Sequence, residues 1–253
     1  MVLKSLNQPN IIIEHEKIET AIQLGEKFFY KLFPWQKFVI ALVHCYEKLD
    51  GITIPVWNRF DLIMGRGSGK NGFISFLIWY FTTPYHGIEN YHVDLVANSE
   101  DQAKRSFVDA YDVLAKHEIV MDKQFEWTKT LIKNTVTGST IEYNTSNSRT
   151  KDSKRTGCVV FDEIHEYESY KEMTVYQSGL GKTPHPRQFV SSSFGYVREG
   201  VFDQELEKNK AILEEKRPMN RRLPLIYALE DAEQAKDPGN WVMSVTSLPY
   251  FPM

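Results

Sequence analysis

The chain has 253 residues, of which 42% are hydrophobic and 25% are charged. This composition predicts a soluble globular protein with room for one large α/β domain or two small ones. The formal net charge of −3 excludes an overall basic field for nucleic-acid binding, although it leaves room for a local basic patch.

The cysteines and the apolar runs indicate the compartment. Cys45 and Cys158 both lie in apolar runs, which predicts unpaired thiols in a reducing environment. The N-terminal apolar run is too short for a signal peptide, and no run reaches the roughly 18 apolar residues of a membrane-spanning helix. The sequence therefore predicts a cytoplasmic protein.

The first half of the chain alternates between helical and extended patterns. Apolar residues spaced by three and four predict a helical region over residues 18–49, which Pro34 interrupts and Gly51 ends. Two short strands, a helix, a further strand and a helix capped by Ser99 follow. We place these five elements at residues 52–57, 60–65, 69–81, 91–98 and 99–117.

The second half begins with a predicted hairpin over residues 130–145, whose turn lies at Thr137-Gly138. A buried strand, a helix, a second buried strand and a long helix follow at residues 157–163, 168–180, 187–193 and 200–216. A mixed tail begins at Arg217. Because strands and helices alternate as far as Ser193, we expect a mostly parallel central sheet flanked by helices.

The segment "FDLIMGRGSGKNGFISF" nearly matches the phosphate-binding pattern G-x-x-x-x-G-K-[ST], but Met64 replaces the first glycine and Asn71 the last residue. Its glycines permit the backbone of an anion-binding loop, and Lys70 stands where a lysine reaches the phosphates. The alternative is a glycine-rich turn with an exposed lysine. We expect the nucleotide to contact Gly65, Arg66, Gly67, Ser68, Gly69, Lys70 and Asn71.

A carboxylate pair ends the strand of "GCVVFDEIHEY". In P-loop ATPases an aspartate in this place holds Mg²⁺, and the next glutamate activates the attacking water. Asp162 and Glu163 are the candidates here, and Asn71 is a second candidate for the metal through its amide oxygen or a water. The alternative is that the two carboxylates cap the next helix. Together, loop and carboxylates predict a P-loop ATPase fold of the RecA-like type that binds ATP and Mg²⁺.

The order of further motifs resembles the ATPase domain of phage large terminases, the motors that package DNA into proheads. The resemblance covers residues 32–248. It includes Gln36 in "LFPWQ", Arg66 in the phosphate loop, and "LVANSEDQAKRSF" with Gln102-Ala103. It also includes "VVFDEIHEY" with His165, and "QFVSSSFGY", which is similar to the family's coupling motif.

The resemblance implies roles for particular residues. Gln36 would recognise adenine, and the serines from Ser191 to Ser193 would sense the γ-phosphate. Arg66 would act at the phosphates with Glu163, while Arg155, or else Arg149, would act as an arginine finger in a neighbouring subunit. The alternative is that the same basic loop, with Lys151 and Lys154, contacts DNA. His165 is expected to pack or to position a neighbour.

The resemblance also implies an organisation. Residues 1–200 would form the ATPase core with an N-terminal helical extension, and residues 201–253 a lid subdomain and the start of a linker to a nuclease domain that we expect to be absent. Six apolar residues of the tail either fold back on the domain or belong to something longer: Trp241, Val242, Val245, Leu248, Tyr250 and Phe251.

The implied partners are double-stranded DNA, the portal protein and the small terminase subunit, with a homo-oligomeric ring forming on the prohead. The implied place is the cytoplasm of an infected bacterial host, away from membranes and from the finished virion. Two alternatives stay open. One is a helicase-type ATPase, and the other is a domain that binds nucleotide without appreciable turnover.

Overall fold

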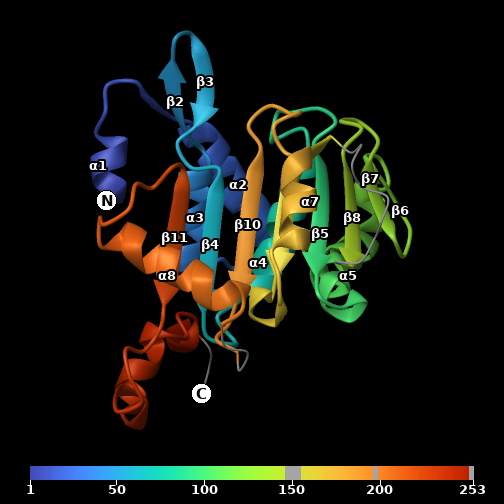
Figure 1. Ribbon diagram of the computed structural model, residues 1–253. Coiled ribbons are helices and arrows are strands. Elements are labelled where there is room, and N and C mark those ends of the chain that lie inside the picture. The colour runs from blue at the N-terminus through green and yellow to red at the C-terminus, as the bar shows by residue number, and fades with distance from the viewer. Residues whose placement is uncertain (146–154, 196–198, 251–253) are drawn as a thin grey trace.

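A parallel sheet forms the centre of the computed structural model, which describes residues 1–145, 155–195 and 199–250 (Figure 1). Its eight strands within these residues lie in the order β11-β4-β10-β9-β5-β8-β7-β6, and neighbouring strands are parallel except in the pairs β8·β7 and β7·β6. The strands are β4 (Arg59–Met64), β5 (His92–Ala97), β6 (Phe125–Trp127), β7 (Leu131–Asn134), β8 (Thr140–Thr145), β9 (Thr156–Asp162), β10 (Arg187–Ser192) and β11 (Arg222–Tyr227). The predicted mostly parallel sheet is confirmed.

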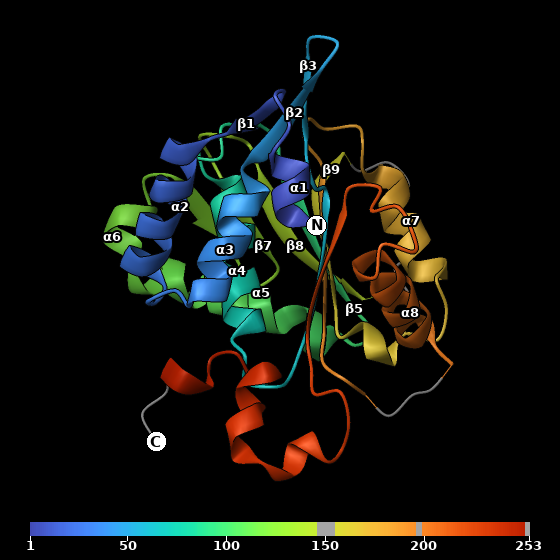
Figure 2. The same cartoon turned by 90° about the vertical axis from the view of Figure 1, so that its left-hand side faces the viewer.

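Helices cover both faces of this sheet, as Figure 2 shows. One face carries α2 (His15–Phe28), α3 (Pro34–Val43), α4 (Lys70–Thr82), α5 (Glu100–Lys116) and the short α6 (Glu118–Met121). The other face carries α7 (Lys171–Gly179) and α8 (Val201–Leu213), and α1 (Val2–Leu6) begins the chain. Two hydrophobic clusters correspond to the two faces. Ser99 caps α5, as predicted.

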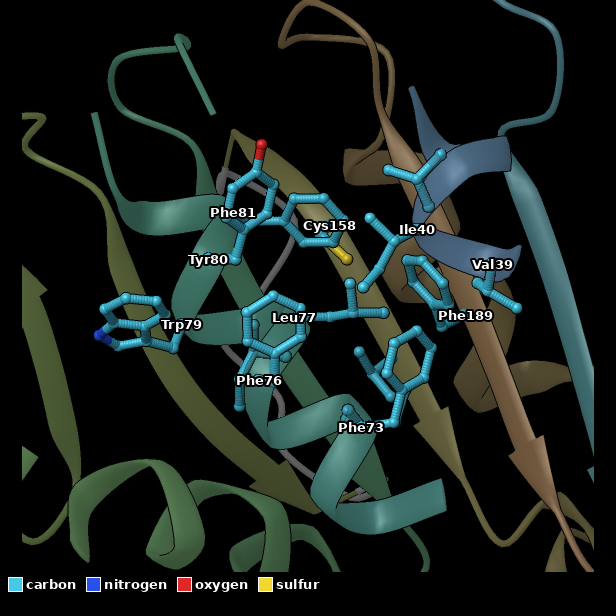
Figure 3. Close-up of a cluster of buried hydrophobic side chains, with 14 of the residues drawn as sticks. Val39, Ile40, Phe73, Phe76, Leu77, Trp79, Tyr80, Phe81, Cys158 and Phe189 are labelled. Atoms are coloured by element: carbon cyan, nitrogen blue, oxygen red, sulfur yellow. The ribbon is translucent and has the colours of Figure 1, made fainter. Parts of the chain in front are cut away.

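Helix α4 is buried along nearly its whole length. The aromatic side chains of α4, from Phe73 to Phe81, pack between the sheet and the outer helices (Figure 3). A helix enclosed on all sides needs no polar face, which explains its uniformly apolar sequence. Cys158 lies among these rings, and it and Cys45 are both free thiols.

A second, smaller sheet corrects the predicted helix over residues 18–49. Its strands are β1 (Ile11–Ile13), β2 (Cys45–Leu49) and β3 (Ile52–Pro55), all antiparallel, so the helical pattern ends at Val43. Asp50 and Gly51 both have positive φ and form the two-residue turn between β2 and β3. The resulting hairpin projects at the opposite end of the molecule from the C-terminal tail (Figure 1).

The segment after residue 200 contributes to the core. β11 pairs in parallel with β4 as an edge strand, and α8 packs on the sheet beside it. A buried ionic cluster joins the three elements: Arg59 and Arg222 each pair with Asp61 and with Glu205 of α8. The predicted domain boundary at residue 200 stays a prediction, and in the structure the central sheet continues past it.

The chain from residue 228 to residue 250 leaves the sheet and forms three 3-10 helices at Gln234–Lys236, Pro238–Met243 and Leu248–Tyr250. It lies beyond the carboxyl ends of the strands (Figure 1). Val245 of the apolar tail lies against the phosphate loop, whereas Trp241, Val242, Leu248 and Tyr250 remain exposed, so the tail packs on the domain only in part. Phe251 lies outside the described residues. None of the helices described has the length and apolar character needed to cross a bilayer.

Candidate functional site

A cavity of about 520 Å³ opens at the carboxyl ends of the central strands. This is the edge at which open α/β sheets bind ligands, and the volume is within the usual range for small-molecule sites. β10 lies between β4 and β9, so the phosphate loop and the carboxylate pair flank its end. The cavity is lined by Arg66, Gly67, Ser68, Gly69, Lys70, Asn71, Gly72, Gln102, Arg105, Glu163, His165 and Glu166.

The phosphate loop, residues 64–71, connects the end of β4 to the start of α4. Gly67 and Gly69 both have φ of +82°, a conformation that favours glycine, and Gly69 directly precedes the helix. Gly65 is not among the positive-φ glycines. The loop therefore presents the N-terminus of α4 to the cavity, the arrangement that binds phosphate groups.

Lys70 is buried within this loop. Its Nζ donates to the carbonyl oxygen of Met64 at 2.9 Å and to that of Gly65 at 3.1 Å. Burial lowers the pKa of Lys70, against the attraction of Glu163 and Asp162. Met64, which replaces the first glycine of the pattern, thus supplies a backbone carbonyl to the lysine, and its own side chain lies in the core.

Asp162 ends β9 with a buried carboxylate whose Oδ1 accepts a hydrogen bond from the Glu163 backbone at 3.1 Å. Burial and the neighbouring charge of Glu163 raise the pKa of Asp162 to about 6. A buried carboxylate that is costly to ionise fits a bound cation. Among the described residues, no three His, Cys, Asp or Glu side chains cluster as metal ligands.

Glu163 follows in a left-handed conformation, with φ of +50°. Its Oε2 lies 3.1 Å from Nδ1 of His165 and accepts from the backbone N and Oγ of Ser193 at 3.4 and 3.3 Å. Burial opposes ionisation, but the hydrogen bond and charge of His165 and the Ser193 amide lower the pKa of Glu163 to about 2. Glu163 is therefore an ionised carboxylate held at the cavity wall.

His165 connects Glu163 to the end of β10. Its Nδ1 also lies 3.1 Å from Oγ of Ser192, and its backbone N donates to the same oxygen. A Cβ placed on Gly195 would lie 2.2 Å from the imidazole ring, so only glycine permits this approach. Ser192 of the coupling motif thus contacts His165, and Ser193 contacts Glu163 directly. The positioning role of His165 stays a prediction.

Gln36 lies behind the phosphate loop and does not line the cavity. Its Oε1 accepts from the Phe33 backbone at 2.8 Å, and its Nε2 donates to the Tyr30 hydroxyl and to the Gly69 carbonyl, both at 3.1 Å. The side chain is completely buried. Adenine recognition by Gln36 stays a prediction, and the contacts present here connect α3 to the loop.

The predicted trans-acting arginine lies away from the cavity. Arg155 is exposed and precedes β9, whereas Asp162 ends it, a separation of about 20 Å along an extended strand. Arg149, Lys151 and Lys154 lie outside the described residues. A role of Arg155 in this chain's own cavity is excluded by its place, and a role in a neighbouring subunit stays a prediction.

Helix α5 contributes two cavity residues that the sequence did not assign. Arg105 lines the cavity, and Gln102 donates to Oε2 of Glu166 at 2.7 Å. The available signal was positional, because α5 follows β5 and its first turns lie at the same sheet edge. The motif resemblance includes Gln102 but implies no contact for it.

Comparisons with known proteins agree with this geometry. The terminase large subunits of Lactococcus phages p2 and SK1 are each 26% identical over 92% of this chain, which covers 46% of their length. The chain thus spans about half the length of the curated relatives it matches. The crystal structure of the HK97 bacteriophage large terminase matches with a TM-score of 0.75 at 16% identity, over 96% of this chain and 50% of that one, which shows a shared fold.

A family model described as the terminase large subunit ATPase domain matches residues 34–211, more than half of the chain. The chain therefore belongs to the family of terminase large subunit ATPase domains.

Proposed function

We propose that this domain binds Mg-ATP in the cavity and hydrolyses it to drive the movement of double-stranded DNA. The observation that carries the proposal is the convergence of Lys70 and Glu163 on one cavity, with Asp162 buried at the adjoining strand end. A buried lysine, an ionised carboxylate and a helix N-terminus are the groups that phosphoryl transfer to water requires.

The residues divide the chemistry between them. The loop amides and Lys70 bind the phosphates, while Arg66 at the cavity mouth offsets negative charge on the transferring group. Asp162, together with Asn71 of the cavity wall, would hold Mg²⁺, which supplies further charge neutralisation when bound. Glu163 accepts a proton from water as the water oxygen bonds to the γ-phosphorus. The bond to the ADP oxygen breaks, and ADP and phosphate leave.

Ser193 and His165 offer a route by which phosphate release reaches the rest of the domain. Both contact the Glu163 carboxylate, and both lie at or beside the end of β10. We infer that loss of the γ-phosphate changes these contacts and moves the segment that follows β10. In an assembled ring on a prohead, with portal protein and small terminase subunit as partners, repeated changes of this kind would translocate DNA. Arg155 of a neighbouring subunit would complete each site.

Calorimetric titration with Mg-ATP or a slowly hydrolysed analogue tests the binding step. Wild-type protein should bind with one site, and Lys70→Ala should weaken binding tenfold or more, about 1.4 kcal/mol. Glu163→Gln should bind as wild type does but lose turnover when the domain is assembled on proheads. Absence of binding by folded wild-type protein would overturn the proposal. Binding without turnover in assembled complexes would favour a nucleotide-binding role alone.

A further inference from the structure

The tail segment, residues 244–250, contacts the phosphate loop at three successive places. The Gly65 backbone N donates to the Ser244 carbonyl at 2.8 Å, and Oγ of Ser68 donates to the same oxygen at 3.1 Å. Oγ of Ser247 donates to the Gly67 carbonyl at 2.6 Å. These bonds join residues about 180 positions apart in the chain, so they are tertiary contacts of the loop.

The approach of the tail segment to the loop is close. A Cβ on Gly65 would lie 2.7 Å from Oγ of Ser244 and 3.0 Å from Cγ2 of Val245, so this glycine is required by the contact and not by its φ. Ser247 and Ser68 are both completely buried. Because buried polar groups need partners, the loop groups covered by the tail segment depend on it.

A second contact extends to the other side of the loop. The ring centroids of Tyr250 and Phe33 lie 5.6 Å apart. Phe33 in turn lies against Gly69, because a Cβ placed on Gly69 would be 3.0 Å from the Phe33 ring. The tail segment therefore reaches from Gly65 at the start of the loop to the neighbour of Gly69 at its end.

The tail segment binds the phosphate loop without lining the cavity, so the cavity stays open to a ligand. Neither Ser244 nor Ser247 lines the cavity, whereas Gly67 and Ser68 do. The Gly67 residue that accepts from Ser247 has left-handed φ, the conformation on which the phosphate-facing amides depend. A hydrogen bond that holds this conformation before the ligand arrives lowers the free energy needed to order the site.

We propose that Ser247 and Ser244 are positioning residues for the phosphate loop, and that the tail segment holds the loop in its phosphate-binding form. The inference rests on the proposed nucleotide binding. Since coupling is reciprocal, a bound nucleotide strengthens the docking of the tail segment by the same factor by which docking strengthens nucleotide binding. Occupancy of the site is thereby coupled to the docking of the tail segment.

A matched pair of single substitutions tests this on the whole chain. Ser247→Ala removes the donor to Gly67, while Thr246→Val removes the adjacent hydroxyl, which is buried and has no hydrogen-bond partner. With Mg-ADP as the titrant, we expect Ser247→Ala to weaken binding about threefold to tenfold, as loss of one buried hydrogen bond implies. Thr246→Val should bind as wild type does.

Two readouts separate positioning from general stability. A purely structural role would lower the Tm of Ser247→Ala equally with and without Mg-ADP, whereas positioning makes the Tm rise produced by Mg-ADP smaller than in wild type. Hydrogen exchange of residues 241–250 in wild type should also slow when Mg-ADP saturates the site, and this measurement stands even if Ser247→Ala does not fold. Unchanged exchange, or equal affinities for Ser247→Ala and wild type, overturns the inference while leaving nucleotide binding intact. Failure of wild type itself to bind Mg-ADP overturns the proposed function and the inference together.

Discussion

Nδ1 of His165 lies 3.1 Å from Oε2 of Glu163, and the same nitrogen lies 3.1 Å from Oγ of Ser192. The imidazole is thus placed between the carboxylate at the cavity and the end of the neighbouring strand. Glu163 occupies a strained left-handed conformation, so its side-chain direction depends on such external contacts.

We therefore predict that His165→Ala lowers the kcat for ATP hydrolysis by roughly 10-fold to 100-fold, a part of the 10²–10⁴ that a general base contributes. The Kd for Mg-ATP should change little, because His165 positions Glu163 rather than the phosphates. His165→Asn, which keeps a donor near the Nδ1 position, should recover a large part of the rate. Steady-state kinetics and titrations on the three proteins test this, and an Asn variant as slow as the Ala variant would contradict it.

A second prediction concerns how much the buried, ionised carboxylate of Asp162 destabilises the folded protein. Its pKa of about 6, against a usual 3.8, corresponds to about 3 kcal/mol of destabilisation when the carboxyl is ionised in the folded protein. The stability contributed by protonated Asp162 is present below about pH 4 and is lost as the pH rises through 6. Asp162→Asn should therefore unfold at higher urea concentration than wild type at pH 7.5, while losing magnesium-dependent activity.

Urea titrations across pH check the sign of this effect. The stability difference between Asp162→Asn and wild type should grow from pH 4 to pH 6 and then stay constant. A difference that does not depend on pH would show that the ionisation of Asp162 is not its source.

The ionic cluster under α8 predicts a pH dependence of stability opposite to that of Asp162. Burial would raise the pKa of Glu205, but Arg59 and Arg222 overcome this and lower the pKa to about 2. The resulting stability is present above about pH 4.5 and is lost as the pH falls toward 2. Glu205→Gln should cost about 3 kcal/mol at pH 7, because it leaves two buried guanidinium groups with one fewer charge partner.

Glu207→Gln is the matched control, since Glu207 lies two residues further along α8 and is exposed. It should change the free energy of unfolding by less than about 0.5 kcal/mol. Denaturant titrations at pH 7 and pH 3 measure both variants. Equal losses in the two variants at pH 7, or a Glu205→Gln loss that persists unchanged at pH 3, would count against the ionic cluster.

The two readings of Gln36 can be separated by the choice of ligand. Gln36→Leu removes the donor to the Gly69 carbonyl. If Gln36 supports the loop, titrations with Mg-ADP, Mg-GDP and magnesium pyrophosphate should all show weakening by a similar factor, about tenfold. If Gln36 instead recognises adenine, only Mg-ADP binding should weaken. We expect the uniform loss, because both amide protons already have partners.

The parts of the site that were predictable are local in the sequence. The strand, glycine loop and helix around Lys70 are contiguous, and Asp162 follows an unmistakable apolar strand, so pattern alone places them. The helix predicted through residue 49 failed because helical spacing continues by chance into β2. The Asp50-Gly51 pair was a hairpin signal that the spacing outweighed.

Contacts between residues far apart in the chain could not be predicted from the sequence pattern. β11 carries a proline and follows a loop, and only its pairing with β4 makes it a strand of the central sheet. Nothing in the spacing of Ser247 shows that it contacts Gly67, 180 residues away. The same holds for Arg105, whose place in the cavity depends on how α5 packs.

The position of β11 has a consequence for synthesis of the protein. β4, which carries the phosphate loop, lies between β10 and β11 and so acquires both neighbours only after residue 227 has emerged from the ribosome. Until then β4 can pair with β10 on one side, but its other side is an unpaired apolar edge, the kind of surface on which nascent chains aggregate. The phosphate loop thus follows a strand that is made early and gains its last neighbour late.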